Sequence, residues 1–397
     1  MKLRYKYQIY PNKSQEQQMI AVGGSVRFVF NHFLKKNIDQ YQLDKKFIWY
    51  NDTCKQLIQM KKDLPWLTET YSQVIQQSLK DLDQALKNIK HGYGFPRFKS
   101  KYTTPISFRY QQHTSISDDR KYLNLPKIGA IRIKLHRQLP SRYTGCTIYQ
   151  NATGWYASFV VEQNAKELTN ITNSVGVDVN SEYTALSSGG LIQNPRPLQK
   201  SMPQIKQLQR KLSKKQKSSK NRIKAKQQLA RKHAKIANKR INHIHQLSSR
   251  IAKDYSLVSV ETLKIEEMKK NRYAAKAIAD AGWAMLATEI EYKCELFGHH
   301  FFKINQWLPS SKTCSSCGTK KTIMPLNIRS FECNNCGVEI HRDINAAKNI
   351  DNWGRQQWMI QNSRWEPPEA PVDVTWDILT NYGSITQSQT KQEAATS

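Results

Sequence analysis

The pattern of apolar and polar residues changes twice along the N-terminal half of the chain. The segment LRYKYQIY alternates between the two kinds and stops at Pro11, which predicts a strand with one buried face. Apolar residues then recur at helical spacing, with Ser14 as the expected N-cap, and this periodicity continues to about Tyr93. Strand-like segments return up to Glu162, the last two joined by the turn NATG. We therefore expect a β-rich block that is interrupted by a mostly helical one.

A different pattern begins near Asn173. The segment SVGVDVNSEYTALSSGGLI predicts strand, turn and strand, and residues 200–250 have helical periodicity with one apolar face. Four further elements follow, in the order strand, helix, strand and helix, at residues 255–265, 279–298, 299–309 and 342–350. This alternation is typical of an α/β sheet. After Trp353 the composition becomes polar and slightly acidic, so we expect residues 354–397 to be largely disordered.

The charge of the chain favours a polyanionic partner. The 397 residues carry 62 Lys and Arg against 31 Asp and Glu, a net charge of +31. Residues 200–250 contain no acidic residue at all, whereas a merely solvated helix usually mixes both signs. A phosphate-binding surface is the interpretation that this asymmetry favours. A merely basic surface and a membrane-surface protein remain as alternatives, although no apolar run is long enough for a spanning helix.

Two cysteine pairs predict a structural metal site. The segment contains Cys314-x2-Cys317, fifteen intervening residues, and Cys333-x2-Cys336, with Gly318 and Gly337 directly after the pairs. Without a signal peptide the cysteines are expected to be reduced, and four thiolates complete the shell of a structural Zn²⁺. Redox chemistry or unmetallated turns are the alternative. The other cysteines are isolated and are expected to be packed thiols.

Three acidic residues stand at positions that suit a second, catalytic metal site. Asp178 lies in the apolar strand VGVDV, Glu261 follows LVSV, and Asp343 begins the helix after the cysteines. Strands that end side by side and a helix start beside them can bring three carboxylates together, an arrangement that needs divalent cations and suits phosphodiester hydrolysis. Each acid also has a structural interpretation: Asp178 as a turn residue, Glu261 as the partner of a lysine, and Asp343 as an N-cap.

The segments that carry a family resemblance are GVDVN, VSVETLKI, ADAGWAML, PSSKTCSSCG, FECNNCG and RDINAAKNI. The order of these elements resembles that of TnpB, the OrfB-type protein of small insertion sequences. That family is similar to the type V CRISPR effector nucleases. The N-terminal half matches more weakly, through YKYQIYPNKSQEQQM, VRFVFNHFL and GFPRFKSKYTTPISFRY, so that the resemblance covers about residues 1–350. It implies an RNA-guided DNA endonuclease.

The resemblance implies a multidomain α+β architecture. A wedge-type β-barrel would comprise residues 1–10 and 97–172, with a helical recognition domain inserted at 11–96. A RuvC-type RNase H-like nuclease domain would comprise residues 173–312 and 338–353, with a zinc ribbon inserted at 313–337. Residues 354–397 have no counterpart.

The resemblance also implies the site residues and partners. Asp178, Glu261 and Asp343 would be catalytic and would hold Mg²⁺, as two ions, while the four cysteines would hold Zn²⁺. The partners would be a guide RNA from the end of the element and target double-stranded DNA. The protein would be cytoplasmic and prokaryotic, and a membrane would not be among its partners. The expected nucleic-acid contacts are the basic residues Arg97, Lys99, Lys101, Arg210, Lys211, Lys214, Lys215, Arg222, Lys224, Arg231, Lys232 and Arg240.

Two positions depart from the family pattern: Asn180 stands where Gly is common, and His341 stands where an acidic residue is frequent. Neither removes a carboxylate of the expected site. Three other functions remain open from the sequence: a guided DNA-binding protein without cleavage, an RNase H-like transposase that joins DNA ends, and a zinc-ribbon RNA-binding protein.

Overall fold

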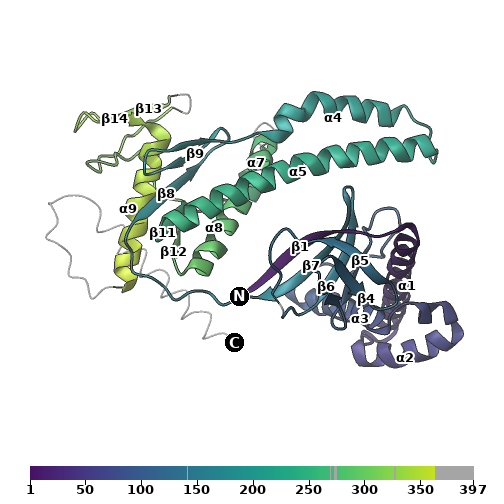
Figure 1. Ribbon diagram of the computed structural model, residues 1–397. Helices are drawn as coiled ribbons and strands as arrows, with labels where there is room; N and C mark the ends of the chain where they lie inside the picture. Colours follow the sequence, from purple (N-terminus) through teal and green to yellow (C-terminus); the bar gives the residue numbers. More distant parts are fainter. Residues whose placement is uncertain (141, 269, 272–274, 326–327, 363–397) are drawn as a thin grey trace. The chain divides into compact units, whose positions relative to one another are not determined.

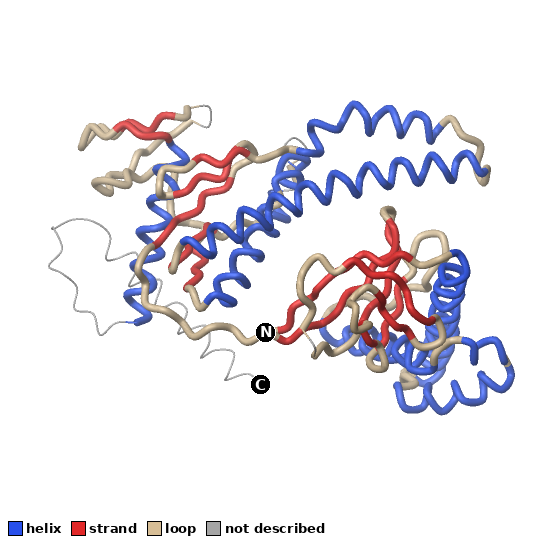
Figure 2. Tube along the Cα trace, in the orientation of Figure 1, coloured by secondary structure: helices blue, strands red, loops and turns tan. Residues whose placement is uncertain are grey.

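The computed structural model describes residues 1–140, 142–268, 270–271, 275–325 and 328–362 (Figure 1). The chain divides into two units. One contains Met1–Asn164 with Gln204–Lys235, and the other contains Ala165–Pro203 with the chain from Ile236 onward. Each unit combines helices and strands, so the expected α+β class is confirmed (Figure 2).

The first unit is built on a seven-stranded antiparallel sheet. The strand β1 (Lys2–Tyr10) lies inside the sheet, because it pairs with β7 along most of its length and with β5 at its end. The strand order is β2-β6-β7-β1-β5-β4-β3. The other bounds are β2 Ser107–Tyr110, β3 Ser115–Ile116, β4 Tyr122–Leu125, β5 Gly129–Lys134, β6 Cys146–Asn151 and β7 Gly154–Glu162. The expected turn NATG joins β6 to β7, which confirms that prediction.

Along the sequence, helices lie between β1 and the other strands of this sheet, as the change of periodicity predicts. They are α1 Lys13–Asp44, α2 Tyr50–Asp63, η1 Pro65–Glu69, α3 Ser72–Lys87 and η2 Asn88–His91. The N-cap of α1 is Asn12 rather than Ser14, so the prediction of Ser14 was wrong. Asn12 accepts the N–H of Gln15 and donates its own N–H to the Gln15 side chain, a capping box that fixes the earlier start.

The second unit contains a five-stranded sheet in the order β10-β9-β8-β11-β12. The strand β8 (Ser174–Val179) is central, antiparallel to β9 and parallel to β11 (Leu257–Glu261), which is in turn parallel to β12. The bounds of the outer strands are β9 Tyr183–Leu186, β10 Leu191–Gln193 and β12 His300–Ile304. β8, β9, β11 and β12 therefore occur where the sequence predicts strands, whereas β10 is a third strand in a segment for which two were predicted.

The pleat of the central strands separates two faces of this sheet. Val175 and Val177 of β8 pack with Val258 and Val260 of β11 against apolar residues of α5 (Lys220–Asp254) and α8 (Trp283–Phe297). Successive side chains of a strand point to opposite faces. The alternate positions, Gly176 and Ser259, accordingly face α9 (Arg342–Asn362).

The remaining elements are α4 Pro197–Ser213, α6 Ile265–Met268, α7 Ala275–Ala281, β13 Ser330–Glu332 and β14 Glu339–His341. The helix α9 continues past Trp353 to Asn362, so the expectation of disorder was wrong for residues 354–362. The rest of the expected disordered tail lies outside the described residues. Among the helices that the structure describes, none combines the length and the apolar character that crossing a bilayer requires.

Candidate active site and metal centre

Four cysteine side chains come together in the second unit, as their spacing predicts. The sulfur atoms of Cys314, Cys317, Cys333 and Cys336 all lie within 4.8 Å of one another. Cys314 is 3.7 Å from Cys336, and Cys317 is 3.5 Å from Cys333. A Zn–S distance of about 2.3 Å places the sulfurs of a tetrahedral site about 3.8 Å apart. The cluster therefore has the dimensions of a four-thiolate site for one ion.

The two cysteine turns have the same backbone geometry. In each, the glycine after the pair donates its N–H to the carbonyl of the first cysteine: Gly318 to Cys314 at 3.0 Å and Gly337 to Cys333 at 2.9 Å. Both glycines have left-handed φ angles, +77° and +70°, which a side chain rarely adopts. The glycines therefore close the turns that direct each pair of sulfurs toward a common point.

The cysteine cluster is bonded to the start of α9 through two buried asparagines. Asn345 accepts the N–H of Ser315 at 2.9 Å and donates to the carbonyl of Thr313 at 2.7 Å. Asn349, one helical turn later, donates to the carbonyls of Ser310 and Thr313. Neither residue was identified from the sequence. A signal for them was present, because two asparagines four residues apart lie on the same face of a helix, next to the apolar residues Ala346 and Ala347.

Asp178 and Glu261 lie on the face of the sheet that α9 covers. They follow Gly176 and Ser259 by two positions, so the pleat places them on the same side as those residues. The parallel ladder ends with the pair Val177 and Val260, and Asp178 and Glu261 are the residues that directly follow this pair. Asp343, in the first turn of α9 and 4% exposed, is the third carboxylate at this edge.

The raised pKa of Asp178 indicates that the other two acids lie near it. Burial, together with the charges of Glu261 and Asp343, raises the pKa of Asp178 from 3.8 to about 7. The backbone N–H of Val179 and the guanidinium of Arg342 lower this pKa only in part. Burial also raises the pKa of Glu261. The three carboxylates thus form an acidic group whose negative charge Arg342 and Arg329 offset only in part.

The contacts of Asp343 show that it does more than begin a helix. Its Oδ2 accepts a 2.6 Å hydrogen bond from Asn180 and lies 3.6 Å from Nη1 of Arg329. The backbone N–H of Asp343 donates to Nδ1 of His341, so that His341 serves as a partner for the start of the helix. The helix begins at Arg342, as the predicted range 342–350 has it, so that Asp343 is its second residue.

Asn180 connects the β8–β9 turn to Asp343. Its side-chain oxygen accepts the N–H groups of Glu182 and Tyr183 at 2.7 and 2.8 Å, and its side-chain nitrogen donates to Asp343. The sequence marked Asn180 only as a departure from the family pattern. Its hydrogen bond to a residue 163 positions away is a long-range contact that local patterns do not contain.

The acidic group is more open than the cysteine cluster. Among the described residues only the four cysteines have all their ligand atoms within 4.8 Å, so the oxygens of Asp178, Glu261 and Asp343 are more widely spread. The structure thus places the three acids at one edge of the sheet without closing them around a single point.

The basic residues that the sequence proposed for nucleic-acid contact fall into two groups. Eight have exposed side chains: Arg97, Lys101, Arg210, Lys211, Lys214, Lys215, Lys224 and Arg231. The other four make contacts within the protein. Lys99 lies 3.6 Å from the ring centre of Phe30, Arg222 donates to the carbonyls of Leu212 and Lys215, Lys232 bonds to Gln204, and Arg240 bonds to the carbonyl of Ala279.

The fold and the site define a two-unit α+β protein with a cluster of four cysteine side chains and a group of carboxylates at the edge of a mixed sheet. Three protein-family models match successive parts of the chain. Their descriptions are "Helix-turn-helix domain" at residues 1–46, "Probable transposase" at 158–272 and "Cas12f1-like, TNB domain" at 283–350. In the first of these ranges the structure has the strand β1 and the single long helix α1.

Two curated proteins match most of this chain. A "Putative RNA-guided DNA endonuclease" of Streptomyces pristinaespiralis is 32% identical over 358 residues, which cover 88% of this chain and 89% of that protein. The "Putative RNA-guided DNA endonuclease InsQ" of Escherichia coli (strain K12) is 30% identical and covers 87% of this chain and 90% of its own. A solved Cas12f1–sgRNA–target DNA complex aligns at a TM-score of 0.36 and 15% identity, over 89% of this chain and 99% of that chain. The sequence matches show that this chain belongs to the TnpB family.

Proposed function

We propose that the chain is an RNA-guided DNA endonuclease and that Asp178, Glu261 and Asp343 form its cleavage site. The observation that carries this proposal is the proximity of the three acids: Asp178 and Glu261 directly follow the paired residues Val177 and Val260, and the charges of Glu261 and Asp343 both raise the pKa of Asp178. Perturbed carboxylates that converge at the edge of a sheet are typical of functional sites. The names of the two relatives that match most of the chain point to the same activity.

The proposed architecture follows from the topology of each unit. The sheet of the second unit combines an antiparallel hairpin with parallel strands beside it, in the order β10-β9-β8-β11-β12, and this supports a RuvC-type RNase H-like domain. The cysteine cluster would be a zinc ribbon inserted before the last catalytic acid. The first unit would be the wedge-type barrel with its inserted recognition helices.

The three acids fit Mg²⁺ because carboxylate oxygens are its preferred protein ligands. A pair of ions about 3.5–4 Å apart needs ligands that are more widely spread than those of a single ion, in keeping with the open acidic group. The ions would supply activation of water and stabilisation of the leaving oxygen. Asp178 and Glu261 would hold them from the sheet, and Asp343 from α9. Asn180 would orient Asp343 by its hydrogen bond.

The thiolates of Cys314, Cys317, Cys333 and Cys336 would hold Zn²⁺ in a structural role, because four protein ligands leave no open coordination position. The partners would be a guide RNA and target double-stranded DNA. Base pairing with the guide would select the target, while the protein reads a short adjacent duplex motif. The eight exposed basic residues would contact phosphates of these nucleic acids.

The test is to co-express the chain with the DNA that flanks its gene, to sequence the bound RNA, and to measure cleavage of a matched duplex. We expect cleavage that requires Mg²⁺ and the RNA, and that is lost in Asp178→Ala, Glu261→Ala and Asp343→Ala. Asp254→Asn, at an exposed carboxylate of the same unit, is the matched control and should leave cleavage unchanged.

Each alternative predicts a different result in the same assay. Guided binding without cleavage would identify a nuclease-inactive protein. DNA-end joining that persists after RNase treatment would identify a transposase. RNA binding without any DNA-directed activity would identify a zinc-ribbon RNA-binding protein.

A further inference from the structure

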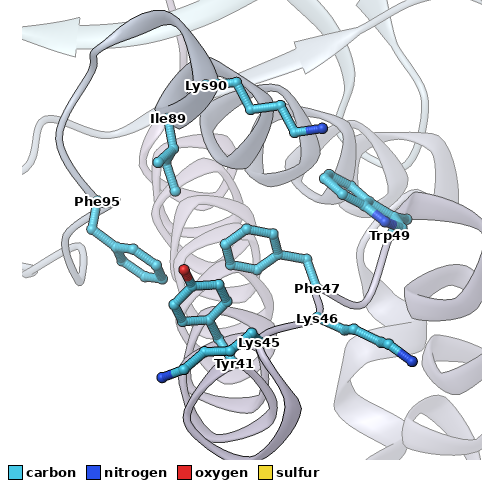
Figure 3. A pocket seen from close by; sticks show the side chains of 8 residues that line it. All are labelled: Tyr41, Lys45, Lys46, Phe47, Trp49, Ile89, Lys90 and Phe95. Atoms are coloured by element: carbon cyan, nitrogen blue, oxygen red, sulfur yellow. The ribbon is translucent and has the colours of Figure 1, made fainter.

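A concave pocket of about 650 Å³ lies in the helical part of the first unit, apart from the acids and the cysteines (Figure 3). It is formed by the end of α1, the loop that leads to α2, and the segment from η2 to Phe95. Its size lies within the range of small-ligand sites. The lining consists of aromatic rings, lysine side chains and Ile89, with no acidic residue.

Aromatic rings make up the apolar part of the pocket. Tyr41 stacks on Phe47 with ring centres 4.7 Å apart, and Phe95 is 6.1 Å from Phe47. Phe47 also meets Trp49 at 5.7 Å, and both pack on the core of the helical block. Tyr41 and Phe95 are 37% and 39% exposed, and Figure 3 shows the rings of Tyr41, Phe47 and Phe95 turned toward one another. The exposed surfaces of the Tyr41 and Phe95 rings are therefore accessible to a planar group of a ligand.

The backbone around these rings is held in place before any ligand binds. The buried side chain of Asn37 accepts the N–H of Ile48 at 2.8 Å and donates to the carbonyl of Phe33 at 2.9 Å. Asp44 accepts the N–H of Lys46, so that the loop is also fixed at its beginning. A pocket that needs little ordering on binding loses less affinity to entropy.

Lysine side chains give the pocket its charge. Lys45, Lys46 and Lys90 line it, and none of them forms an ion pair with any residue that the structure describes. The ammonium of Lys45 lies 5.3 Å from the ring centre of Tyr41. The two oxygens of Asp44 accept from Lys46 N–H and from Gln40, which directs this acid to the helix end. Three lysine side chains in a lining with aromatic rings suit the phosphates and the base of a nucleotide.

The segment that leaves the pocket continues the same chemistry. After Phe95 come the exposed basic residues Arg97 and Lys101 and the aromatic residues Phe98 and Tyr102, which are 53% and 76% exposed. Alternating aromatic and basic side chains along an exposed segment suit a single strand, because each base offers a face for stacking and each phosphate a charge.

We propose that this pocket binds an unpaired nucleotide of a single-stranded nucleic acid. The base packs against Tyr41, Phe47 and Phe95, and the adjoining phosphates bind Lys45, Lys46 and Lys90. The source of the strand is RNA or DNA, which offer the same base and phosphate chemistry. This site goes beyond the proposed cleavage site, since it shares no residue with it.

The test uses the full chain with two oligonucleotides of the same sequence, one RNA and one DNA, each carrying 5-iodouridine for photocrosslinking to a stacked aromatic ring. Peptide mapping should place crosslinks at Tyr41, Phe47 or Phe95. The double variant Tyr41→Ala/Phe95→Ala should reduce the yield at Phe47 about tenfold, the contribution of one stacked base. Both residues are at the surface, so the fold should persist. Tyr122→Ala, an aromatic residue of the same unit with 42% exposure, is the matched control.

Competition experiments distinguish the contribution of base stacking to binding from the contribution of phosphate charge. An abasic strand of equal length should displace the crosslinked strand at least tenfold less effectively than a strand with bases, and Lys45→Ala/Lys46→Ala/Lys90→Ala should weaken crosslinking. Crosslinking by the RNA alone or the DNA alone supports the site and identifies the source. Crosslinks that map only elsewhere, equal competition by the abasic strand, or preferential displacement by polyglutamate would overturn it. Asp178→Ala should retain the crosslinks, so this proposal and the cleavage proposal can fail independently.

Discussion

Asp178 shows at the scale of a single residue why a cation would favour the ionised form of the proposed acidic site. Its pKa is raised to about 7, so between pH 4 and pH 7 it holds a proton in the folded protein that it would lose on unfolding. The causes are burial and two neighbouring carboxylates, which act together against its ionised form. A bound divalent cation reverses that balance.

This residue makes the stability of the metal-free protein depend on pH. Because the folded pKa is raised from 3.8, the folded state binds more protons than the unfolded state between pH 4 and pH 7. The free energy of unfolding should therefore fall as the pH rises through this window, by at most about 4 kcal/mol, and then become level. Thermal unfolding in Mg²⁺-free buffer without a chelator, from pH 4 to 8, measures it. Mg²⁺ should restore stability at pH 8, and Asp178→Asn should flatten the profile; an equally steep fall in Asp178→Asn would contradict this explanation.

Asn180 is expected to be a positioning residue. Asn180→Gly removes the donor to Asp343, a hydrogen bond to a charged group worth about 1.5–3 kcal/mol. We expect the Mg²⁺ concentration for half-maximal cleavage to rise about tenfold or more, while the rate at saturating Mg²⁺ changes little, because the bound ions themselves hold Asp343. Cleavage assays across a Mg²⁺ titration separate the two quantities. A large loss of rate at saturating Mg²⁺ would instead give Asn180 a direct part in the reaction.

At the scale of elements, the close approach of α9 to the sheet sets the position of Asp343. A Cβ on Gly176 would lie 1.9 Å from the carbonyl oxygen of Ala347 and 2.5 Å from the N atom of Asp351. Both neighbours are backbone atoms of α9, so neither can rotate away. The small residue in β8 is therefore what allows α9 to lie against the strand that carries Asp178.

Gly176→Ala should destabilise the second unit by about 3 kcal/mol or more, because overpacking here displaces a whole helix. Gly24→Ala is the control for the same chemical change, since its Cβ would meet only the end of the Arg27 side chain at 4.0 Å. That substitution lies inside a helix and should stabilise the protein by up to about 1 kcal/mol. Urea unfolding of the two variants makes the comparison, and equal stability would show that α9 can move freely.

The cysteine cluster is expected to support the acidic group through α9. Cys333→Ser should lower bound zinc and also raise the Mg²⁺ requirement of cleavage, because Asn345 and Asn349 bond α9 to the backbone beside the cluster. Metal analysis and a Mg²⁺ titration measure the two effects. Cys146→Ser, at a buried cysteine of the first unit, should change neither metal requirement. Loss of zinc without any change in the Mg²⁺ titration would show that the two sites are independent.

At the scale of the whole molecule, the sequence predicts local order better than distant contacts. The strand around Asp178, the strand before Glu261 and the paired cysteines have short-range signatures, namely apolar runs with one acid and C-x2-C spacing. The bond from Asn180 to Asp343 and those from Asn345 to the cysteine segment join residues far apart in the chain. The aromatic pocket likewise gathers Tyr41 and Phe95 from separate segments. Charge alone also could not separate exposed Lys214 from Arg240, which bonds within the protein.

The central claim concerns where the chain cuts DNA, and replacing the guide tests it most directly. The bound RNA is identified, its guide segment is exchanged for an unrelated sequence, and the purified complex is given the old and the new duplex target in Mg²⁺. RNA-guided cleavage predicts that the cut moves to the new target, and that Asp178→Ala cuts neither. Cleavage that stays at the old target, or that proceeds equally without RNA, would contradict the account.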